Sequence, residues 1–257
     1  MDQQKLIVAS FNVRVPCDPA PYDWEGRKPR VRWLFKKNAF HICGLQEAVK
    51  QQIDDIVECS SYAYTGGGRD DFKDGGEHSC IVYDTERLEL LESGTFGLSE
   101  FPDVPGARSW GSCCPRIASW GKFKDKVTGK ELMVYNTHLD HVSELARVKG
   151  IEMVVDHAKE NGTGLPMILM GDFNAGPDSE TYKVAADLLR DSRAISESGH
   201  VGPDKTFQKY GMDVKDRPID FIFVSQEIRV FSHVTDDRKP GDEFASDHYP
   251  VIATIGF

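Results

Sequence analysis

Pro166-Met167-Ile168-Leu169-Met170-Gly171-Asp172-Phe173-Asn174 is the stretch that decides how this chain folds. The apolar run that ends at Met170 is typical of a strand buried on both faces. A glycine ends the run, and Asp172 and Asn174 follow it directly. Such residues can form an ordinary turn. They can also present polar atoms at the rim of a sheet, where a metal or a phosphate group binds.

The same arrangement occurs at five other places, where polar residues adjoin or interrupt an apolar strand. The segments are Ser10-Phe11-Asn12, Leu45-Gln46-Glu47, Asn136-Thr137-His138-Leu139-Asp140, Ile219-Asp220-Phe221-Ile222-Phe223 and Ser246-Asp247-His248. Taken singly, each has a structural explanation, such as a turn asparagine or a glutamate that complements a helix dipole. All six occur in one chain in a compatible order, so coincidence is the weaker explanation.

Side chains of these types suit the hydrolysis of a phosphate ester. The ester's anionic oxygens repel a nucleophile, and a divalent cation neutralises that charge. Magnesium prefers oxygen ligands and keeps several waters, so one or two carboxylates suffice to bind it. A second acid takes a proton from the attacking water. Histidines and asparagines donate hydrogen bonds where negative charge develops.

Composition narrows the class of protein. The 257 residues are 40% hydrophobic and 28% charged, as in a soluble globular protein. The first residues, Met1-Asp2-Gln3-Gln4-Lys5, lack the basic and apolar regions of a signal peptide, so we expect a cytoplasmic protein with no membrane partner. The net charge of −10 argues against broad attraction to duplex nucleic acid. No obligate protein partner is evident.

Hydrophobic periodicity predicts a mixture of strands and helices along the chain. Strands are expected at 6–11, 41–45, 80–83, 88–96, 117–123, 132–137, 166–170, 219–224 and 249–255, and helices at 31–40, 48–58, 142–160 and 179–189. The basic stretch from Arg27 to Lys37 is interpreted as a solvated helix face. Hairpins beside strand-helix-strand units indicate an α/β fold of two mixed sheets packed face to face with helices outside. We expect residues 1–257 to form one domain.

At these motifs the sequence resembles the endonuclease/exonuclease/phosphatase superfamily, from about Lys5 to Ile255. This group includes deoxyribonuclease I, apurinic endonucleases, deadenylases, neutral sphingomyelinases and inositol polyphosphate phosphatases. The resemblance implies a four-layered α/β sandwich with its site at one rim of the two sheets. It also implies Mg²⁺ or Mn²⁺ as the cofactor, with Glu47 as a ligand and Asn12 and Asp247 near the metal.

The resemblance implies catalytic roles for five further residues. Asp172 would position or deprotonate the attacking water, and Asn174 would hold the phosphate or the water. His248 would donate a hydrogen bond to a phosphate oxygen, and Asp220 would fix the orientation of its ring. His138 would contact the phosphate or the leaving group.

The closest likeness is to a bacterial-type subgroup with a deadenylase-like pattern. It rests on segments 24–30, 68–71, 76–78, 114–118 and 205–207. Within them, Arg69 and Arg116 could clamp a second phosphate or a carboxylate, or could form structural ion pairs. Trp24 could stack on a base or fasten a loop to the core. His78 is a further candidate for substrate binding.

Three hypotheses follow from the sequence. The leading one is a metal-dependent phosphodiesterase that acts on single-stranded RNA or DNA or on a nucleotide. The second keeps the chemistry but has a small phosphorylated metabolite or a lipid headgroup as the substrate, because the chain is acidic. The third is a non-catalytic binding module. Loss of a ligand or a base would mark the third, and the sequence has lost none.

Overall fold

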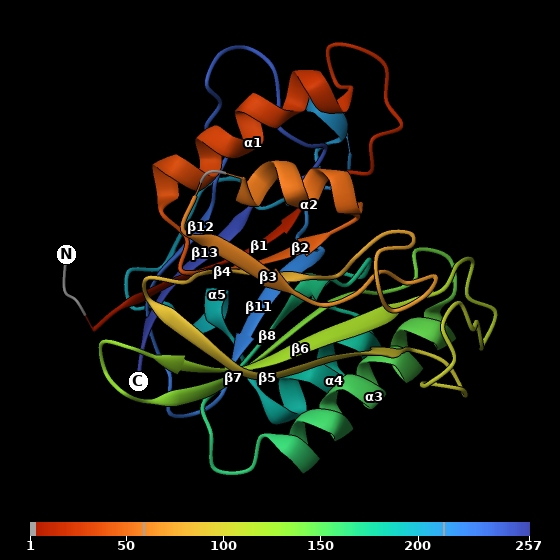
Figure 1. The fold of residues 1–257 in the computed structure, drawn as a ribbon, viewed down its shortest axis with the longest axis vertical. Coiled ribbons are helices and arrows are strands. Elements are labelled where there is room, and N and C mark those ends of the chain that lie inside the picture. Colours follow the sequence, from red (N-terminus) through yellow and green to blue (C-terminus); the bar gives the residue numbers. More distant parts are fainter. Residues whose placement is uncertain (1–3, 59, 213) are drawn as a thin grey trace.

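Two mixed β-sheets packed face to face form the centre of the computed structural model, which describes residues 4–58, 60–212 and 214–257 (Figure 1). Among these residues the first sheet has seven strands, in the order β10-β12-β13-β1-β2-β4-β3, and the second has six, in the order β5-β6-β7-β8-β11-β9. Residues 1–3, which belong to the segment considered for a signal peptide, lie outside the described residues, as do Cys59 and Asp213.

The strands of the first sheet are β1 (Leu6–Asn12), β2 (Ile42–Gln46), β3 (Tyr62–Thr65), β4 (Ile81–Asp84), β10 (His200–Val201), β12 (Arg229–Thr235) and β13 (Val251–Gly256). Those of the second are β5 (Leu88–Gly97), β6 (Ile117–Asp125), β7 (Glu131–His138), β8 (Met167–Asp172), β9 (Arg190–Asp191) and β11 (Asp220–Val224). The helices are α1 (Trp24–Asn38), α2 (Lys50–Val57), α3 (Glu144–Asn161), α4 (Glu180–Leu188), α5 (Ser192–Ile195) and the 3-10 turn η1 (Lys209–Gly211).

Alternation of side chains along the strands separates three apolar clusters. In β1, Leu6 and Val8 point between the sheets, whereas Ala9 and Phe11 point outward toward α1 and α2. In β8, Ile168 and Met170 join the central cluster and Leu169 packs on the side of α3 and α4. Helices α1 and α2 therefore cover one sheet and α3 and α4 the other, which confirms the predicted four-layered α/β sandwich (Figure 1).

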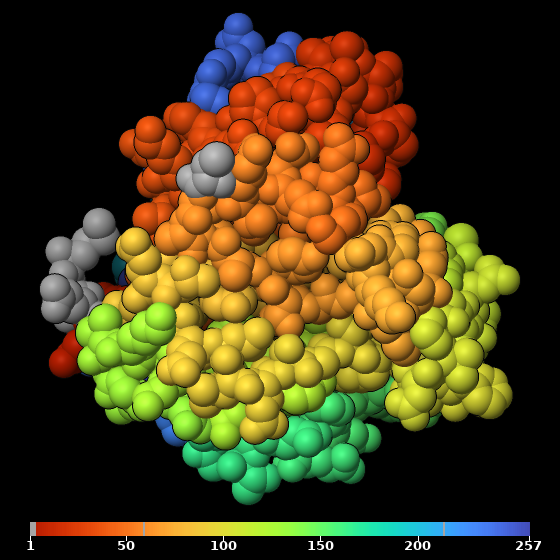
Figure 2. Space-filling model, in the orientation of Figure 1, coloured from red at the N-terminus to blue at the C-terminus, as the bar shows by residue number. Residues whose placement is uncertain are grey.

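Most of each half of the sandwich comes from one continuous part of the chain. In the space-filling view, residues before about 60, in red and orange, occupy the upper part, and the yellow and green middle of the chain occupies the lower part (Figure 2). The end of the chain then returns, because β13 pairs with β1 in the first sheet. Among the described residues, none of the helices combines the length and the hydropathy that a membrane span requires.

A buried polar contact crosses the space between the sheets near one rim. The Asn136 amide of β7 donates to the carbonyls of Leu45 and Cys80, at 2.8 Å each, and its oxygen accepts from Gln46 Nε2 at 2.7 Å. Gly44 makes room for it, since a Cβ there would lie 2.6 Å from Asn136 Oδ1. Hydrogen-bonded groups of this kind fix one register between sheets that apolar contacts alone would not specify.

Helix α1 begins at Trp24 and not at Val31, so the predicted start was wrong. Pro29 lies inside the helix, where a proline removes one backbone hydrogen bond and normally argues for a break. Asp23 compensates at the N-terminus, because its side chain accepts from Gly26 N at 3.2 Å.

The prediction of a solvated basic helix face was wrong for Arg27. Its side chain is fully buried. The guanidinium donates to the carbonyls of Tyr22, Val13 and Arg14, the last at 2.8 Å. Arg27 therefore shapes the loop after β1 and does not face solvent.

Gly171 allows the backbones of β7 and β8 to approach closely at the rim. A Cβ there would meet the Thr137 carbonyl oxygen at 2.1 Å. We expect Gly171→Ala to lower the free energy of unfolding by about 1–3 kcal/mol through this overlap, measured by thermal and urea unfolding. Gly129→Ala is the control, because its φ is also positive but its added methyl meets nothing within 4 Å. Equal losses in the two variants would refute the explanation.

Candidate active site

Strand register brings the predicted site residues together at one rim of the sandwich. In the second sheet, Asp172 at the end of β8 lies opposite His138 on β7 and opposite Asp220 on β11. In the first sheet, Asn12 at the end of β1 pairs with Gln46, so Glu47 follows beside it. The rims of both sheets thus contribute side chains to a single cluster.

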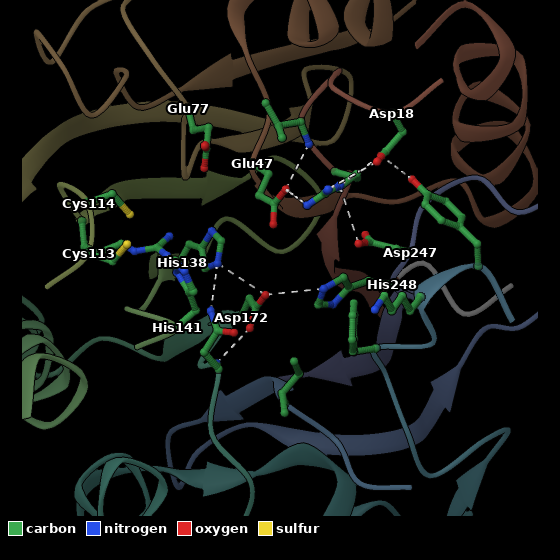
Figure 3. A pocket seen from close by; sticks show the side chains of 18 of the residues that line it. Asp18, Glu47, Glu77, Cys113, Cys114, His138, His141, Asp172, Asp247 and His248 are labelled. Atoms are coloured by element: carbon green, nitrogen blue, oxygen red, sulfur yellow. Dashed lines mark hydrogen bonds and ion pairs between the residues drawn. The ribbon is translucent and has the colours of Figure 1, made fainter. Parts of the chain in front are cut away.

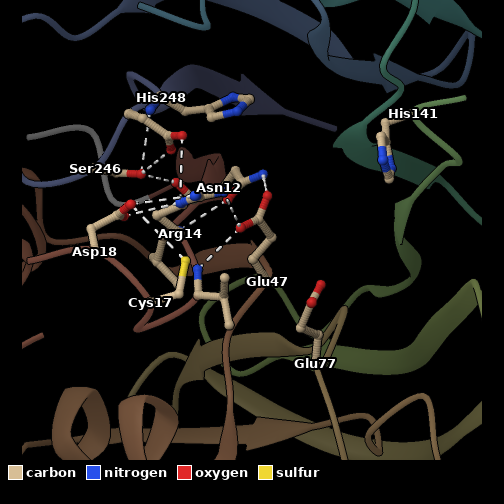
Figure 4. A network of polar contacts seen from close by, with 12 residues as sticks. Asn12, Arg14, Cys17, Asp18, Glu47, Glu77, His141, Ser246 and His248 are labelled. Carbon is tan, nitrogen blue, oxygen red and sulfur yellow. Dashed lines mark hydrogen bonds and ion pairs between the residues drawn. The ribbon is translucent and has the colours of Figure 1, made fainter. Parts of the chain in front are cut away.

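The Asn12 amide joins the two rims. Its Nδ2 donates to Glu47 Oε1 and to Asp172 Oδ2, each at 3.0 Å, and the residue is fully buried. The Asn12 carbonyl in turn accepts from Ser246 Oγ at 2.6 Å, which holds the 246–248 loop in place (Figure 4). Through its side chain and its backbone carbonyl together, Asn12 therefore positions groups from three separate segments.

Asp172, His248 and Asp220 form a buried charge chain. His248 Nδ1 lies 2.9 Å from Asp220 Oδ2, and His248 Nε2 lies 3.7 Å from Asp172 Oδ2. Burial would lower the pKa of His248, but the charge and hydrogen bond of Asp220, with the charges of Asp172 and Asp247, raise it to about 10. Burial, together with the charge of Asp220, raises the pKa of Asp172 to about 7. The ring is thus a cation at neutral pH, beside an acid poised to take or release a proton.

His138 has the opposite electrostatic environment. Burial, with the charge of Arg116 nearby, holds the pKa of its imidazole well below the usual value. Its Nε2 lies 3.0 Å from the Asn174 amide nitrogen and 3.5 Å from Asp172 Oδ2 (Figure 3). Asn174 itself has a φ of 50°, an uncommon value that aims its side chain at this point. One neutral and one cationic histidine therefore flank Asp172.

Glu47 and Asp247 offer the carboxylates that could hold a metal. Their side chains are 14% and 9% exposed, and hydrogen bonds from Asn12 and Val15 help keep the pKa of Glu47 low despite its burial. Two buried carboxylates that face one space suit a hard divalent cation with oxygen ligands. Asp172, Asp220 and His248 also come close enough to share an ion. An ion that took His248 Nδ1 as its ligand would displace the hydrogen bond between His248 and Asp220.

Arg14 is a site residue that the sequence analysis missed. Its guanidinium lies 3.0 Å from Asp18, 3.6 Å from Glu47 and 3.7 Å from Asp247 (Figure 4). The backbone φ of Arg14 is 59°, and the buried Arg27 fixes this conformation through the Arg14 carbonyl. The signal available was a basic residue two positions after Asn12.

A pocket of about 660 Å³ opens over this cluster. Its walls include Asp172, Asn174, His138, His248, Glu47 and Asp247, together with Arg69 and Arg116 from the sequence-predicted substrate residues. They also include residues that the sequence did not single out, among them Asp18, His141, Lys209 and Tyr210. Asn12 and Asp220 lie beneath the walls and support them.

Two predicted substrate residues are not brought to this pocket. Trp24 is 6% exposed within the cluster under α1, and its Nε1 donates to Asp55 at 2.7 Å, so it fastens a helix and does not face a substrate. His78 is 1% exposed, and its ring nitrogens lie near the carbonyls of Ala48 and Lys73. The structure gives no support to substrate contact by either residue, because burial and local hydrogen bonds account for both side chains.

A model of the endonuclease/exonuclease/phosphatase family matches residues 9–248, nearly the whole chain. The chain belongs to this family. A Bacteroides vulgatus structure described as an endonuclease/exonuclease/phosphatase is 34% identical, with a TM-score of 0.93 over 98% of this chain and 99% of that one. A mannosyl-6-phosphatase of Bacteroides thetaiotaomicron VPI-5482 is 35% identical, with a TM-score of 0.89 over 98% of this chain and 100% of that one.

Nocturnin of Xenopus laevis is 28% identical over 148 residues, which are 51% of this chain and 38% of that protein. The chain thus spans well under half the length of this curated relative. Members of the family hydrolyse phosphoester bonds and generally depend on a divalent cation. This chain is accordingly a phosphoester hydrolase of the family, and a buried group of acids and a histidine could bind a metal.

The contact between Asp220 and His248 gives a direct test of the charge chain. We expect Asp220→Asn to lower kcat by roughly 10²-fold or more, as for loss of a preorganised transition-state donor. Without the Asp220 charge the His248 pKa falls, so the ring loses its proton at lower pH and the alkaline limb of the pH–rate profile moves to lower pH. Asp191→Asn, at another buried acid outside this pocket, is the control. An unchanged profile in Asp220→Asn would contradict this role.

Proposed function

We propose that this chain is a divalent-metal-dependent phosphatase whose substrate is a small, polar phosphorylated molecule of the sugar phosphate type. The observation that carries the proposal is the pocket itself. It is compact, at about 660 Å³, and charged side chains of both signs line it, including Asp18, Glu77 and Lys209. Such walls suit a molecule with hydroxyl groups and a phosphate better than a run of stacked bases.

Two further observations favour a small substrate over a nucleic acid. Trp24, which the sequence suggested could stack on a base, is the first residue of α1 and packs in the apolar cluster under that helix. The mannosyl-6-phosphatase is 35% identical over 98% of this chain and 100% of that one, whereas Nocturnin of Xenopus laevis is 28% identical over 51% of this chain. The second hypothesis from the sequence therefore moves ahead of the first.

Glu47 and Asp247 would hold the cation, with Asn12 beside them, and the cation would neutralise charge on the phosphate and polarise its phosphorus–oxygen bonds. Asp172 would take a proton from the attacking water, because its pKa near 7 suits proton transfer at neutral pH. The cationic His248 would donate from Nε2 to a phosphate oxygen. Its Nδ1 is already committed to Asp220, so the ring needs no reorientation during the reaction.

His138 and Asn174 would complete the phosphate site from the other side of Asp172. The His138 ring stays neutral and therefore adds no charge that would trap the product phosphate. Asn174 lies between His138 and the Leu139 carbonyl, so its amide is held in one orientation. Both hydrogens of the Asn174 amide are engaged in these contacts, so Asn174 would donate to the phosphate by exchanging one of them.

A nuclease acting on single-stranded nucleic acid is the second candidate, and one feature favours it. Tyr210 lines the pocket and stacks on Tyr22, with ring centroids 3.9 Å apart. A stacked aromatic pair at a pocket wall could receive a base. The likeness to part of Nocturnin points the same way.

Hydrolysis of a substrate panel tests the proposal. The panel holds mannose 6-phosphate, glucose 6-phosphate, an aryl phosphomonoester, an aryl phosphodiester, poly(A) RNA and single-stranded DNA, each with Mg²⁺, Mn²⁺ or EDTA. We expect sugar phosphates to give the highest kcat/KM and EDTA to abolish turnover. Asp172→Ala should lower kcat by about 10²–10⁴-fold, whereas Asp191→Ala should keep it.

Each contrary result has a defined meaning. Preference for the oligonucleotides would replace the leading proposal with the nuclease. Equal activity of Asp172→Ala and wild type would refute the assigned proton acceptor. If none of the esters were cleaved with either metal, the proposed phosphatase function would be wrong, and the binding module that the sequence left open would regain weight.

A further inference from the structure

One part of the pocket carries arginines that the proposed reaction does not use. Figure 3 shows Cys113, Cys114 and His141 gathered on one side of the pocket, across from Asp18 and Asp247. Arg69 Nη1 lies 3.7 Å from Cys114 Sγ, and Arg116 Nη2 lies 2.9 Å from His141 Nδ1. Both arginines line this pocket, and together with His138 they also line a small second cavity.

Arg116 is buried without being satisfied. Its side chain is 5% exposed, and among the described residues its Nε has no hydrogen-bond partner. The Asp140 carboxylate lies 3.6 Å from this nitrogen, so it forms an ion pair with Arg116 but is too far for a hydrogen bond. Asp140 instead accepts from the backbone nitrogens of Cys113, Val142 and Ser143. A buried charged donor left free is costly unless something else binds it.

Arg69 also keeps donors available. One of its nitrogens contacts Glu77, at 2.8 Å, and the two side chains are 21% and 20% exposed. Burial raises the pKa of Glu77 although Arg69 opposes the shift. The remaining guanidinium nitrogens of Arg69 are not committed to Glu77, so this ion pair leaves Arg69 able to bind a second anion.

His141 adds a third donor to the same place. Arginine can only donate, so His141 Nδ1 accepts from Arg116 and the ring proton of the neutral form lies on Nε2. Cys114, Asp140 and His141 also come close enough together to suggest a cation site. The Arg116 guanidinium, however, lies against both Asp140 and His141 and would repel a cation. Glu77 and Asp140 balance the charges of the two arginines, so an anion would be bound through the guanidinium donors that these ion pairs leave uncommitted.

We propose that Arg69, Arg116 and His141 form a second anion-binding subsite, so that the preferred substrate carries a carboxylate or a second phosphate besides the phosphate that is hydrolysed. The inference rests on the proposed function, because it specifies the substrate of the same pocket. The planar fork of a guanidinium suits both kinds of oxyanion. The subsite favours sugar phosphates that carry a second anionic group over sugar phosphates whose only anionic group is the phosphate that is hydrolysed.

Matched substrates test the subsite. Glucose 6-phosphate carries one anionic group, 6-phosphogluconate adds a carboxylate, and glucose 1,6-bisphosphate adds a phosphate. For the wild type we expect kcat/KM to be at least about tenfold higher for one of the doubly anionic compounds, as loss of a charged hydrogen bond implies. Preference for 6-phosphogluconate would identify the second group as a carboxylate, and preference for glucose 1,6-bisphosphate would identify it as a phosphate. Arg116→Gln and Arg69→Gln should each remove the preference, measured within each variant as the ratio of kcat/KM for the compound with two anionic groups to kcat/KM for glucose 6-phosphate.

Arg193→Gln is the matched control. Arg193 is 25% exposed and pairs with Asp204 in a separate pocket, so the substitution removes a similar charge and should keep the preference. Arg116→Lys keeps the positive charge without the planar guanidinium, so it should retain part of the substrate preference that Arg116→Gln loses. Circular dichroism and thermal unfolding establish that each variant folds. If Arg116→Gln does not fold, Arg69→Gln and Arg116→Lys decide the outcome.

The inference and the proposed function fail in different ways. Hydrolysis of glucose 6-phosphate by wild type with no preference, or equal losses on all three compounds in Arg116→Gln, would overturn the subsite and leave the phosphatase standing. If the wild type cleaved none of them, calorimetry with inorganic phosphate and pyrophosphate in EDTA would still decide. Tighter binding of pyrophosphate that is lost in Arg116→Gln but kept in Arg193→Gln supports the subsite, and equal binding refutes it.

Discussion

The buried amide of Asn12 is the interaction on which the rest of the site depends. It gives its two hydrogens to carboxylates from different sheets, Glu47 and Asp172. Buried carboxylates that face one another repel and are costly to desolvate, so without a shared donor they would move apart or become protonated. The amide compensates part of that cost and holds both oxygens toward one space. The packing of the two sheets thereby determines the geometry of the site.

Around this amide the fold places similar groups in unlike environments. His248 is held as a cation by Asp220, whereas His138 is kept neutral by burial and by Arg116. Asp172 lies between the two rings. Pairs of titratable groups whose environments separate their pKa values are typical of acid–base catalysis. Here the difference in pKa follows from strand register, because His138, Asp172 and Asp220 lie side by side on three adjacent strands of one sheet.

Much of this arrangement could be predicted from the sequence, because each polar motif adjoins or interrupts an apolar run that is long enough to read as a strand. That holds for Asn12, Glu47, Asp172 and His248. Short strands such as β9 and β10 were not predicted, because two residues are too few to show a hydrophobic periodicity. The polar residues Ser232 and His233 masked β12 in the same way.

Arg14 and Trp24 escaped for a different physical reason. Their places depend on tertiary contacts between distant segments. Arg27 reaches back to the loop after β1 and sets the backbone of Arg14, and Asp55 of α2 receives the indole of Trp24. Sequence spacing reports which residues share a strand or a helix. It does not report which buried guanidinium organises a neighbouring loop.

Anomalous diffraction from crystals grown with Mn²⁺ tests the central claim most directly. We expect the ion between the carboxylates of Glu47 and Asp247, next to Asn12, with Asp220 still hydrogen-bonded to His248. A manganese peak at that position, absent in crystals of Glu47→Gln, is the predicted result. A peak inside the group formed by Asp172, Asp220 and His248 instead, or none at all at saturating Mn²⁺, would contradict the account.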